Sequence, residues 1–240
     1  MHRSLRLTLA VAALSMALPV KSHAAGPWVQ VGWWKLNETG GVALVDSTSG
    51  NTGTAYGPTV ATDCNAASRC RYFDGVNDFA DLPWSAKTQP GTKNFRAVLT
   101  IWPAGPKPPA GDDLFRSSGY PNPFWKMEYN DPNPTDGAQP NLGRLNCSFR
   151  GSAGQSYVAG GPDLSLGGGH TVECRLLHGA GSGGQDRTEL WVDGSRRTYL
   201  DTNVGSIQTG VSTIVGAHCC VDAGYFTGWT DDLKLYTATP

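Results

Sequence analysis

The stretch Phe226–Tyr236 (FTGWTDDLKLY) is the last of four short phrases that together decide the fold. It follows Gly32–Glu38 (GWWKLNE), Arg71–Asp78 (RYFDGVND) and Leu190–Gly194 (LWVDG). Each phrase is a short apolar or aromatic run broken by Gly or Asp, as in strands that enter or leave tight turns. The four phrases span nearly the whole chain, so they predict one architecture throughout.

The rest of the sequence alternates with a period of two. Apolar residues fall two apart in residues 95–101, 145–149 and 172–176, as in strands that bury one face. Gly (31) and Pro (16) are frequent, and Glu occurs only four times, a composition that favours turns and strands over helices. These patterns predict an all-β fold of two packed antiparallel sheets, a β-sandwich of the jelly-roll type. No internal repeat is visible, which predicts a single domain over residues 25–240.

The four phrases resemble the laminin G-like (LamG, concanavalin A-like) jelly-roll family in its secreted bacterial form. The resemblance covers nearly all of the chain after its first residues, and it implies a sandwich in which the phrases are structural. We therefore expect Trp34, Phe73 and Trp191 in the core. Asp74-Gly75 and Asp193-Gly194 are expected in turns.

The N-terminus has the pattern of a signal peptide. A basic start is followed by the apolar run Leu7–Val20, and Ser22-His23-Ala24 offers a small-x-small cleavage site. The run is too short to cross about 30 Å of hydrocarbon as a helix. The sequence thus predicts a signal peptide over residues 1–24, with Ala25 as a nearby alternative cleavage point, and a secreted or extracytoplasmic product.

The charge balance bears on the partners. Without residues 1–24 the chain keeps 16 basic and 20 acidic residues, a net charge of −4. Nucleic acids and anionic membranes both require a concentrated basic patch, so neither is expected as a partner. No later segment is long and apolar enough to span a membrane. We expect a monomer that binds a glycan or an extracellular protein.

Six cysteines in an exported chain predict disulfides, although 15 connectivities are possible. Cys64 and Cys70 bracket a small polar loop that closes easily. Cys147 and Cys174 occupy core-facing positions of strands expected to be neighbours, and the family resemblance also implies this pair. For Cys219 and Cys220 two alternatives stay open, a vicinal disulfide or unpaired thiols.

The nearest approach to a catalytic signature is Arg187-Thr188-Glu189-Leu190, which is similar to an element of jelly-roll alginate lyases. The other segments expected of that family do not occur, and the LamG strand and turn account for these residues structurally. Glycoside hydrolysis needs two carboxylates at a controlled separation. The Glu residues are isolated in the sequence, which disfavours a hydrolase. A polysaccharide lyase or hydrolase therefore remains as the alternative function, beside a structural or adhesive extracellular role.

Aromatic residues near loops are the candidate ligand site. Trp84, Tyr120, Phe124, Trp125 and Tyr129 lie in or beside segments rich in Pro, Gly and Asn. Such rings can stack on a sugar face, and loops on a rigid sandwich are where function collects. The alternative is that the rings only cover the sandwich. On this basis we predict a non-catalytic binding module for carbohydrate.

One structural calcium ion is the candidate cofactor, because hard oxygen ligands are plentiful and the family resemblance implies that such sandwiches often hold one near the chain ends. Asp46 and Asp232 are the candidate ligands, but ordinary turn and side-chain capping is the favoured role of both. A transition-metal site that uses His218 with the adjacent cysteines is disfavoured, since no second Cys/His group lies at normal spacing.

Overall fold

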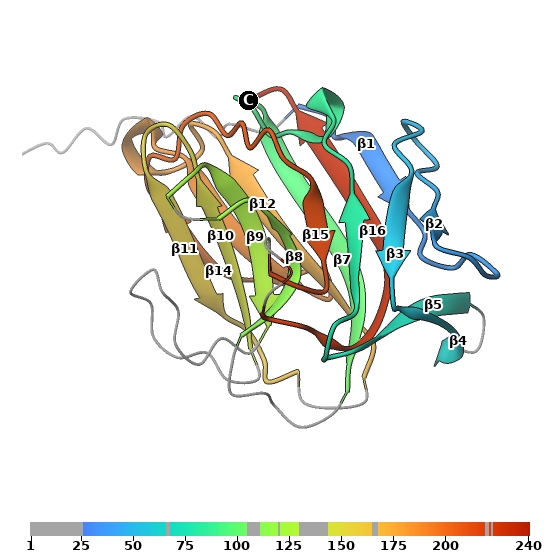
Figure 1. Ribbon diagram of the computed structural model, residues 1–240. Helices are drawn as coiled ribbons and strands as arrows, with labels where there is room; N and C mark the ends of the chain where they lie inside the picture. The colour runs from blue at the N-terminus through green and yellow to red at the C-terminus, as the bar shows by residue number, and fades with distance from the viewer. Residues whose placement is uncertain are drawn as a thin grey trace, which may run out of the picture.

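A computed structural model describes residues 26–65, 68–104, 111–119, 121–129, 144–164, 168–218, 221 and 223–240. Two antiparallel sheets of eight strands each pack face to face (Figure 1). This confirms the predicted all-β, two-sheet sandwich. The signal-peptide prediction (residues 1–24) and the predictions for Tyr120, Cys219 and Cys220 lie outside the described residues.

The first sheet, called sheet A, has the order β14-β13-β12-β7-β16-β5-β4, and β1 pairs with β16 beside this path. Its strands are β14 (Ser195–Asp201), β13 (Arg187–Val192), β12 (His170–Leu177), β7 (Asn94–Pro103), β16 (Thr227–Ala238), β5 (Ser68–Asp74), β4 (Thr59–Asn65) and β1 (Val29–Trp34).

The second sheet, called sheet B, has the order β11-β10-β9-β8-β15-β6-β3-β2. Its strands are β11 (Gln155–Gly160), β10 (Leu145–Arg150), β9 (Phe124–Tyr129), β8 (Asp112–Ser117), β15 (Thr213–Val215), β6 (Phe79–Leu82), β3 (Gly53–Tyr56) and β2 (Ala43–Leu44). Two short 3-10 turns, η1 (Ala86–Thr88) and η2 (Ser182–Gly184), complete the secondary structure of the described residues. None of the helices there could carry the chain across a bilayer.

The core lies between the sheets and follows the predicted alternation. Phe95, Ala97, Leu99 and Ile101 of β7 all point inward and are fully buried. Phe95 meets Trp125 from sheet B with ring centroids 4.9 Å apart. Trp34 and Phe73 are buried as predicted, and both are among the largest fully buried side chains. Each sheet therefore has one apolar inner face and one outer face with a different composition.

The predicted turn at Asp193-Gly194 is confirmed. Both residues have positive φ, 51° and 71°, and they join β13 to β14 as a two-residue hairpin loop. Positive φ at both central positions suits the right-handed twist of the flanking strands, and Asp-Gly tolerates it. Gly75 also has positive φ, 78°, and ends the strand of the second phrase, as expected for Asp74-Gly75.

Both predicted disulfides among the described residues are present. Cys64–Cys70 closes the short loop between β4 and β5, with Cα atoms 6.2 Å apart. Cys147–Cys174 has a Cα separation of 5.7 Å. The expectation that its two strands are neighbours is wrong, because β10 belongs to sheet B and β12 to sheet A. Period-two alternation shows that a residue faces the core, but it does not show which sheet contains it.

Candidate functional site

The outer face of sheet A carries four partly exposed tryptophans: Trp33, Trp102, Trp191 and Trp229. They lie on β1, β7, β13 and β16, at positions that alternate with inward residues. Large aromatic side chains are usually buried in the core, so a group of them on the outer face of a sheet suggests a binding surface. This face is therefore the first candidate for a binding surface.

Three of its rings form a row across neighbouring strands. In the register of the sheet, Trp229 of β16 lies opposite Trp102 of β7 on one side and opposite Tyr72 of β5 on the other. The rings of Tyr72 and Trp229 are 4.9 Å apart and tilted by 51°. Adjacent strands lie about 4.8 Å apart. The row, called the aromatic row, thus presents one ring per strand.

A hollow of about 370 Å³ adjoins the aromatic row. A β-bulge in β16, with Asp232 at φ 56°, turns two successive carboxylates toward it. Its lining combines two indoles with polar groups of both charge signs: Trp33, Lys35, Asn37, Thr100, Trp102, Asp231 and Asp232. The hollow could accommodate a small polar ligand next to an aromatic surface.

The two indoles of the hollow, Trp33 and Trp102, are held in place by different contacts. Trp33 donates its indole N–H to Asp232 over 2.5 Å, and two ammonium groups lie over its ring, from Lys35 at 4.7 Å and Lys234 at 5.0 Å. Trp102 has its indole edge against Gly169, where an added Cβ would come within 2.4 Å of the indole nitrogen. Trp33 is therefore held in place by cations, while Trp102 is fixed by packing at one edge.

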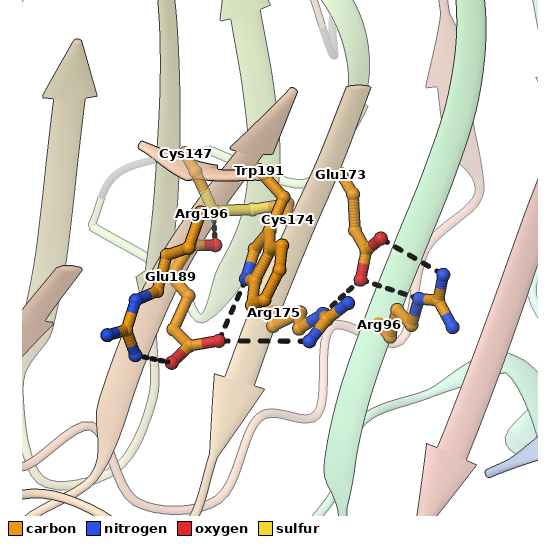
Figure 2. Close-up of polar contacts among 8 residues, drawn as sticks. All are labelled: Arg96, Cys147, Glu173, Cys174, Arg175, Glu189, Trp191 and Arg196. Carbon is orange, nitrogen blue, oxygen red and sulfur yellow. Dashed lines mark hydrogen bonds and ion pairs between the residues drawn. A yellow bond between two sulfur atoms is a disulfide. The ribbon is translucent and has the colours of Figure 1, made fainter. Parts of the chain in front are cut away.

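A ladder of alternating charges covers the other part of the same face (Figure 2). Glu173 pairs with Arg96 at 2.6 Å and also with Arg175. Glu189 accepts hydrogen bonds from Arg196 and from the Trp191 indole, each over 2.8 Å. The guanidinium of Arg175 lies 3.9 Å from the centre of the Trp191 ring. Within this ladder the charged groups have partners, so it is chiefly a structural element.

The ladder corrects one prediction. Trp191 was expected in the core, but it lies partly exposed on the outer face, between Arg175 and Glu189. Leu190 and Val192 on either side fill the core instead. In the phrase LWVDG the strand turns its two aliphatic residues inward, and a tryptophan can be accommodated outside because a guanidinium covers its face.

The apparent lyase element also belongs to this face. Arg187 donates two hydrogen bonds to Asp201, at 2.7 and 3.0 Å. The hydrogen bond from Arg187 is the largest cause that lowers the pKa of Asp201 to about 2. Glu189 is engaged in the ladder. Both side chains of the element thus serve in ion pairs between β13 and β14.

Three of the five aromatics predicted to bind a ligand are buried. Phe124, Trp125 and Tyr129 all lie on β9, and all three are buried. Trp125 packs against Phe95 and also against Phe115, at 5.4 Å. A buried ring cannot stack on a sugar, so these three cover the sandwich. Trp84 is 47% exposed, and its role in binding stays a prediction.

The two carboxylates predicted to bind calcium have protein donors. Asp46 accepts hydrogen bonds from the backbone N–H groups of Trp33 and Thr48 and from the Ser49 hydroxyl. Asp232 accepts from the Trp33 indole and from Lys234. Among the described residues no group of three or more His, Cys, Asp or Glu side chains is placed to hold a metal ion. The calcium site stays a prediction.

Comparison with known proteins identifies the fold only. No family model matches the chain, and no curated protein sequence is similar to it. Among solved structures it is similar to domain 4 of AbnA, a GH43 extracellular arabinanase from Geobacillus stearothermophilus, in complex with arabinotriose. That similarity has 16% identity, covers 89% of this chain and 95% of the other, and gives a TM-score of 0.61.

Toxin binding domains show the same architecture. The binding domain of Paraclostridial Mosquitocidal Protein 1 gives a TM-score of 0.66 at 12% identity over 88% of this chain. The receptor binding domain of botulinum neurotoxin D gives 0.60 at 12% identity, again over 88%. The chain spans about half the length of these two, 49% and 50%. The class defined by fold and site is thus a jelly-roll β-sandwich with an aromatic outer face.

The sequence reasoning missed Trp102, Trp229 and Tyr72. The available signal was alternation: Trp102 continues the outward series of residues 96, 98 and 100, whose inward partners were recognised correctly. The bulge in β16 was not visible in the same way. Two adjacent Asp residues do not show that the register shifts between them.

Proposed function

We propose that this protein is a non-catalytic binding module for carbohydrate, with the ligand on the aromatic row and in the adjoining hollow. The single observation that carries the proposal is the row Trp102–Trp229–Tyr72 on the outside of sheet A, next to a hollow with polar lining. Sugar rings have one apolar face and a rim of hydroxyl groups. An aromatic ring suits the face, and Asn37, Thr100 and Asp231 offer donors and acceptors for the rim.

The charge of the hollow favours a neutral glycan. Its lining contains Lys35, Asp231 and Asp232, and Lys234 pairs with Asp232 over 3.0 Å. Two cations therefore accompany two carboxylates, which gives no net attraction for an acidic sugar. The arabinanase domain of similar fold is described in complex with arabinotriose. That similarity supports carbohydrate as the ligand class. The preference for a neutral sugar is inferred from the balanced charges of the hollow.

The test is a glycan array followed by calorimetric titration with the best-binding neutral oligosaccharide. We expect Trp102→Ala to weaken binding about tenfold or more, which corresponds to about 1.4 kcal/mol. The matched control is Trp84→Ala, because Trp84 is an exposed tryptophan outside the aromatic row. Loss of binding with Trp84→Ala and full binding with Trp102→Ala would overturn this location and restore the loop site predicted from sequence.

The enzyme alternative is tested on the same samples. Acidic and neutral polysaccharides are incubated with the protein, and release of unsaturated or reducing ends is measured. We expect none. Product that disappears with Arg187→Ala or Glu189→Ala would show a lyase, in contradiction to the ion-pair role of these side chains.

Several broader features belong to the same proposal. Two disulfides support an extracytoplasmic location, since such bonds persist mainly in oxidising compartments. We further propose that residues 1–24 are removed on export, that the mature chain is a monomeric LamG-like domain, and that an extracellular protein is the second candidate partner. Edman sequencing of the secreted protein and light scattering test the first two points. Binding to a glycoprotein that survives enzymatic removal of its sugars would favour the protein partner.

A further inference from the structure

The hollow lies beside the aromatic row and not at its end. The row crosses the strands, because Tyr72, Trp229 and Trp102 lie opposite one another on β5, β16 and β7. The hollow is displaced along the strands: its lining includes Thr100 and Asp231, which pair with each other two residues further along β7 and β16. Trp102 belongs to both the row and the hollow. The surface therefore has two parts that meet at Trp102, one across the strands and one along them.

Solvent reaches both parts of this surface. The three rings of the aromatic row are each partly exposed. In the hollow, Asn37 is exposed, and Lys35, Thr100 and Asp232 are partly exposed. Ligand pockets usually have volumes of about 300–1,000 Å³. A hollow of about 370 Å³ is at the small end of that range, so it suits one small group and not a long chain.

The rings of the aromatic row do not share one plane. Tyr72 and Trp229 are tilted by 51° with their centroids 4.9 Å apart. Neighbouring strands of a sheet are also rotated against each other by about 20–25°. A flat surface made of many parallel glycan chains requires coplanar rings, whereas one separate chain can twist to follow them. With one ring per strand and strands about 4.8 Å apart, the row suits consecutive sugar residues of a single chain.

Small residues lie at both ends of the aromatic row. Tyr72 pairs with the exposed Thr59 of β4. At the other end, the edge of the Trp102 indole fills the space that a side chain on Gly169 would need. Neither position carries a side chain large enough to close the row. The interior of a chain, and not only its end, can therefore lie on the three rings.

The hollow offers hydrogen bonds where the row offers rings. Lys35 and Asn37 supply donors, and Asn37 and Asp231 supply acceptors. The Trp33 indole already donates to Asp232 over 2.5 Å, and the Lys35 ammonium lies 4.7 Å from the centre of its ring. Trp33 is thus a fixed wall whose ring is covered by a cation. The hollow therefore suits a small group with several hydroxyls.

We propose that this site binds a branched neutral polysaccharide, with consecutive residues of its main chain on the aromatic row and a short side branch in the hollow. A linear chain that follows the row passes the hollow by. A branch on the sugar residue at Trp102 occupies both parts at once, because Trp102 is where they meet. The balanced charges of the hollow favour a neutral branch. The inference rests on the proposed function for the class of ligand and adds the branch as the recognised feature.

Calorimetric titration of matched oligosaccharides tests the proposal. Each pair has the same number of sugar residues, either in a linear chain or in a shorter chain with one internal branch. The pairs are xylopentaose with arabinosyl-xylotetraose, mannopentaose with galactosyl-mannotetraose, and cellopentaose with xylosyl-cellotetraose. We expect the branched member of at least one pair to bind more tightly, by about tenfold. A branched member that binds no more tightly in any pair would overturn the branch alone, and no binding by any oligosaccharide would overturn the proposed function with it.

Two indole N–H signals report where each part of the ligand lies. In the 15N-labelled full chain, the Trp33 signal reports on the hollow and the Trp229 signal on the aromatic row. With the pair that shows the preference, we expect the linear chain to shift the Trp229 signal alone and the branched chain to shift both. A branched ligand that leaves the Trp33 signal in place, or a linear ligand that shifts it equally, would contradict the assignment of the branch to the hollow.

Variants separate the two parts of the site. Asn37→Ala and Thr100→Val change the lining of the hollow, so the preference for the branched member should fall from about tenfold toward equal affinity. Trp229→Ala should weaken both members by a similar factor. Asn77→Ala is the matched control, because Asn77 is an equally exposed asparagine that lies in the turn after β5, outside the hollow. A preference that is unchanged in both hollow variants would overturn the hollow as the site of the branch.

Discussion

The outer faces of the two sheets differ in how their charged side chains are exposed to water. On sheet A the carboxylates of the ladder, Glu173 and Glu189, are buried, but its arginines and the Trp191 ring between them are partly exposed (Figure 2). On sheet B, four charged residues are buried together: Asp113, Arg116, Lys126 and Glu128. Surface ion pairs contribute about 0–1 kcal/mol, because water screens them. Buried charges instead depend on every partner, since removal from water costs several kcal/mol per ion. Loss of a cation should therefore cost less on the first face, where the cations reach water, than on the second, where they are buried.

The largest effect is expected from Lys126→Met. This change leaves the buried Glu128 carboxylate with Arg116 as its remaining described cation, at 3.4 Å. We expect the free energy of unfolding to fall by about 3–5 kcal/mol, measured by urea denaturation.

Arg196→Met is the control on sheet A, because Arg196 pairs with Glu189 but its side chain is 42% exposed. It should cost less than Lys126→Met, because the Trp191 indole still donates to the Glu189 carboxylate and Arg175 lies 3.9 Å from it. Equal losses of unfolding free energy in Lys126→Met and Arg196→Met would contradict the difference between the two outer faces.

Removal of the Cys147–Cys174 disulfide comes next. This bond ties β10 of sheet B to β12 of sheet A across the core. The double change to Ala should cost about 2–5 kcal/mol. The Cys64–Cys70 bond closes a loop with a sequence separation of 6, against 27 for the cross-sheet bond, so its removal should cost less. If the two double variants had the same urea midpoint, loop length would not be the deciding factor.

A smaller effect is expected from Asp46→Ala in the segment between β2 and β3. The carboxylate accepts bonds from two backbone N–H groups, of Trp33 and Thr48, and from the Ser49 hydroxyl. We expect a loss of about 1–3 kcal/mol, with the same value in CaCl2 and in EDTA. Calcium that raises the Tm of the wild type but not of Asp46→Ala would instead support the predicted metal site.

The last prediction compares how Asp112 and Asp201 make the free energy of unfolding depend on pH. Burial raises the pKa of Asp112 on β8 to about 8, so the folded state holds a proton that the unfolded chain releases. Stability from this group is present at low pH and is lost as pH rises toward about 8. The pKa of Asp201 on β14 is lowered to about 2, so its contribution is present at neutral pH and is lost as pH falls toward that value.

Two variants test these opposite signs. Asp112→Asn should flatten the decline of the urea midpoint as pH rises toward about 8, and Asp201→Asn should flatten its decline as pH falls toward about 2. The Asp201 effect should be the smaller one, because its pair with Arg187 lies at the edge of sheet A and water screens it. The same sign for both variants would show that burial does not govern Asp112.

Sequence reasoning succeeded where the signal was local. The four phrases and the period-two runs predicted the strands around Trp34, Phe95 and Cys174 and the turn at Asp193, since alternation and turn chemistry depend on nearest neighbours along the chain. It failed at Trp191, whose outward position depends on Arg175 from the next strand. It also failed for the aromatics of β9, which were expected in a binding site and lie in the core or under charged groups.

By itself, the sequence determined the sandwich and its two disulfides among the described residues. Only the tertiary structure decided which residues meet on each outer face. Glu128 looks isolated in the sequence, and Asp113 reaches it from the neighbouring strand; Trp102 and Trp229 are far apart in the chain and adjacent in the sheet. Strand pairing is set by long-range packing of the whole core, so no short stretch of sequence contains it. A site built across paired strands appears only when the sheets have formed.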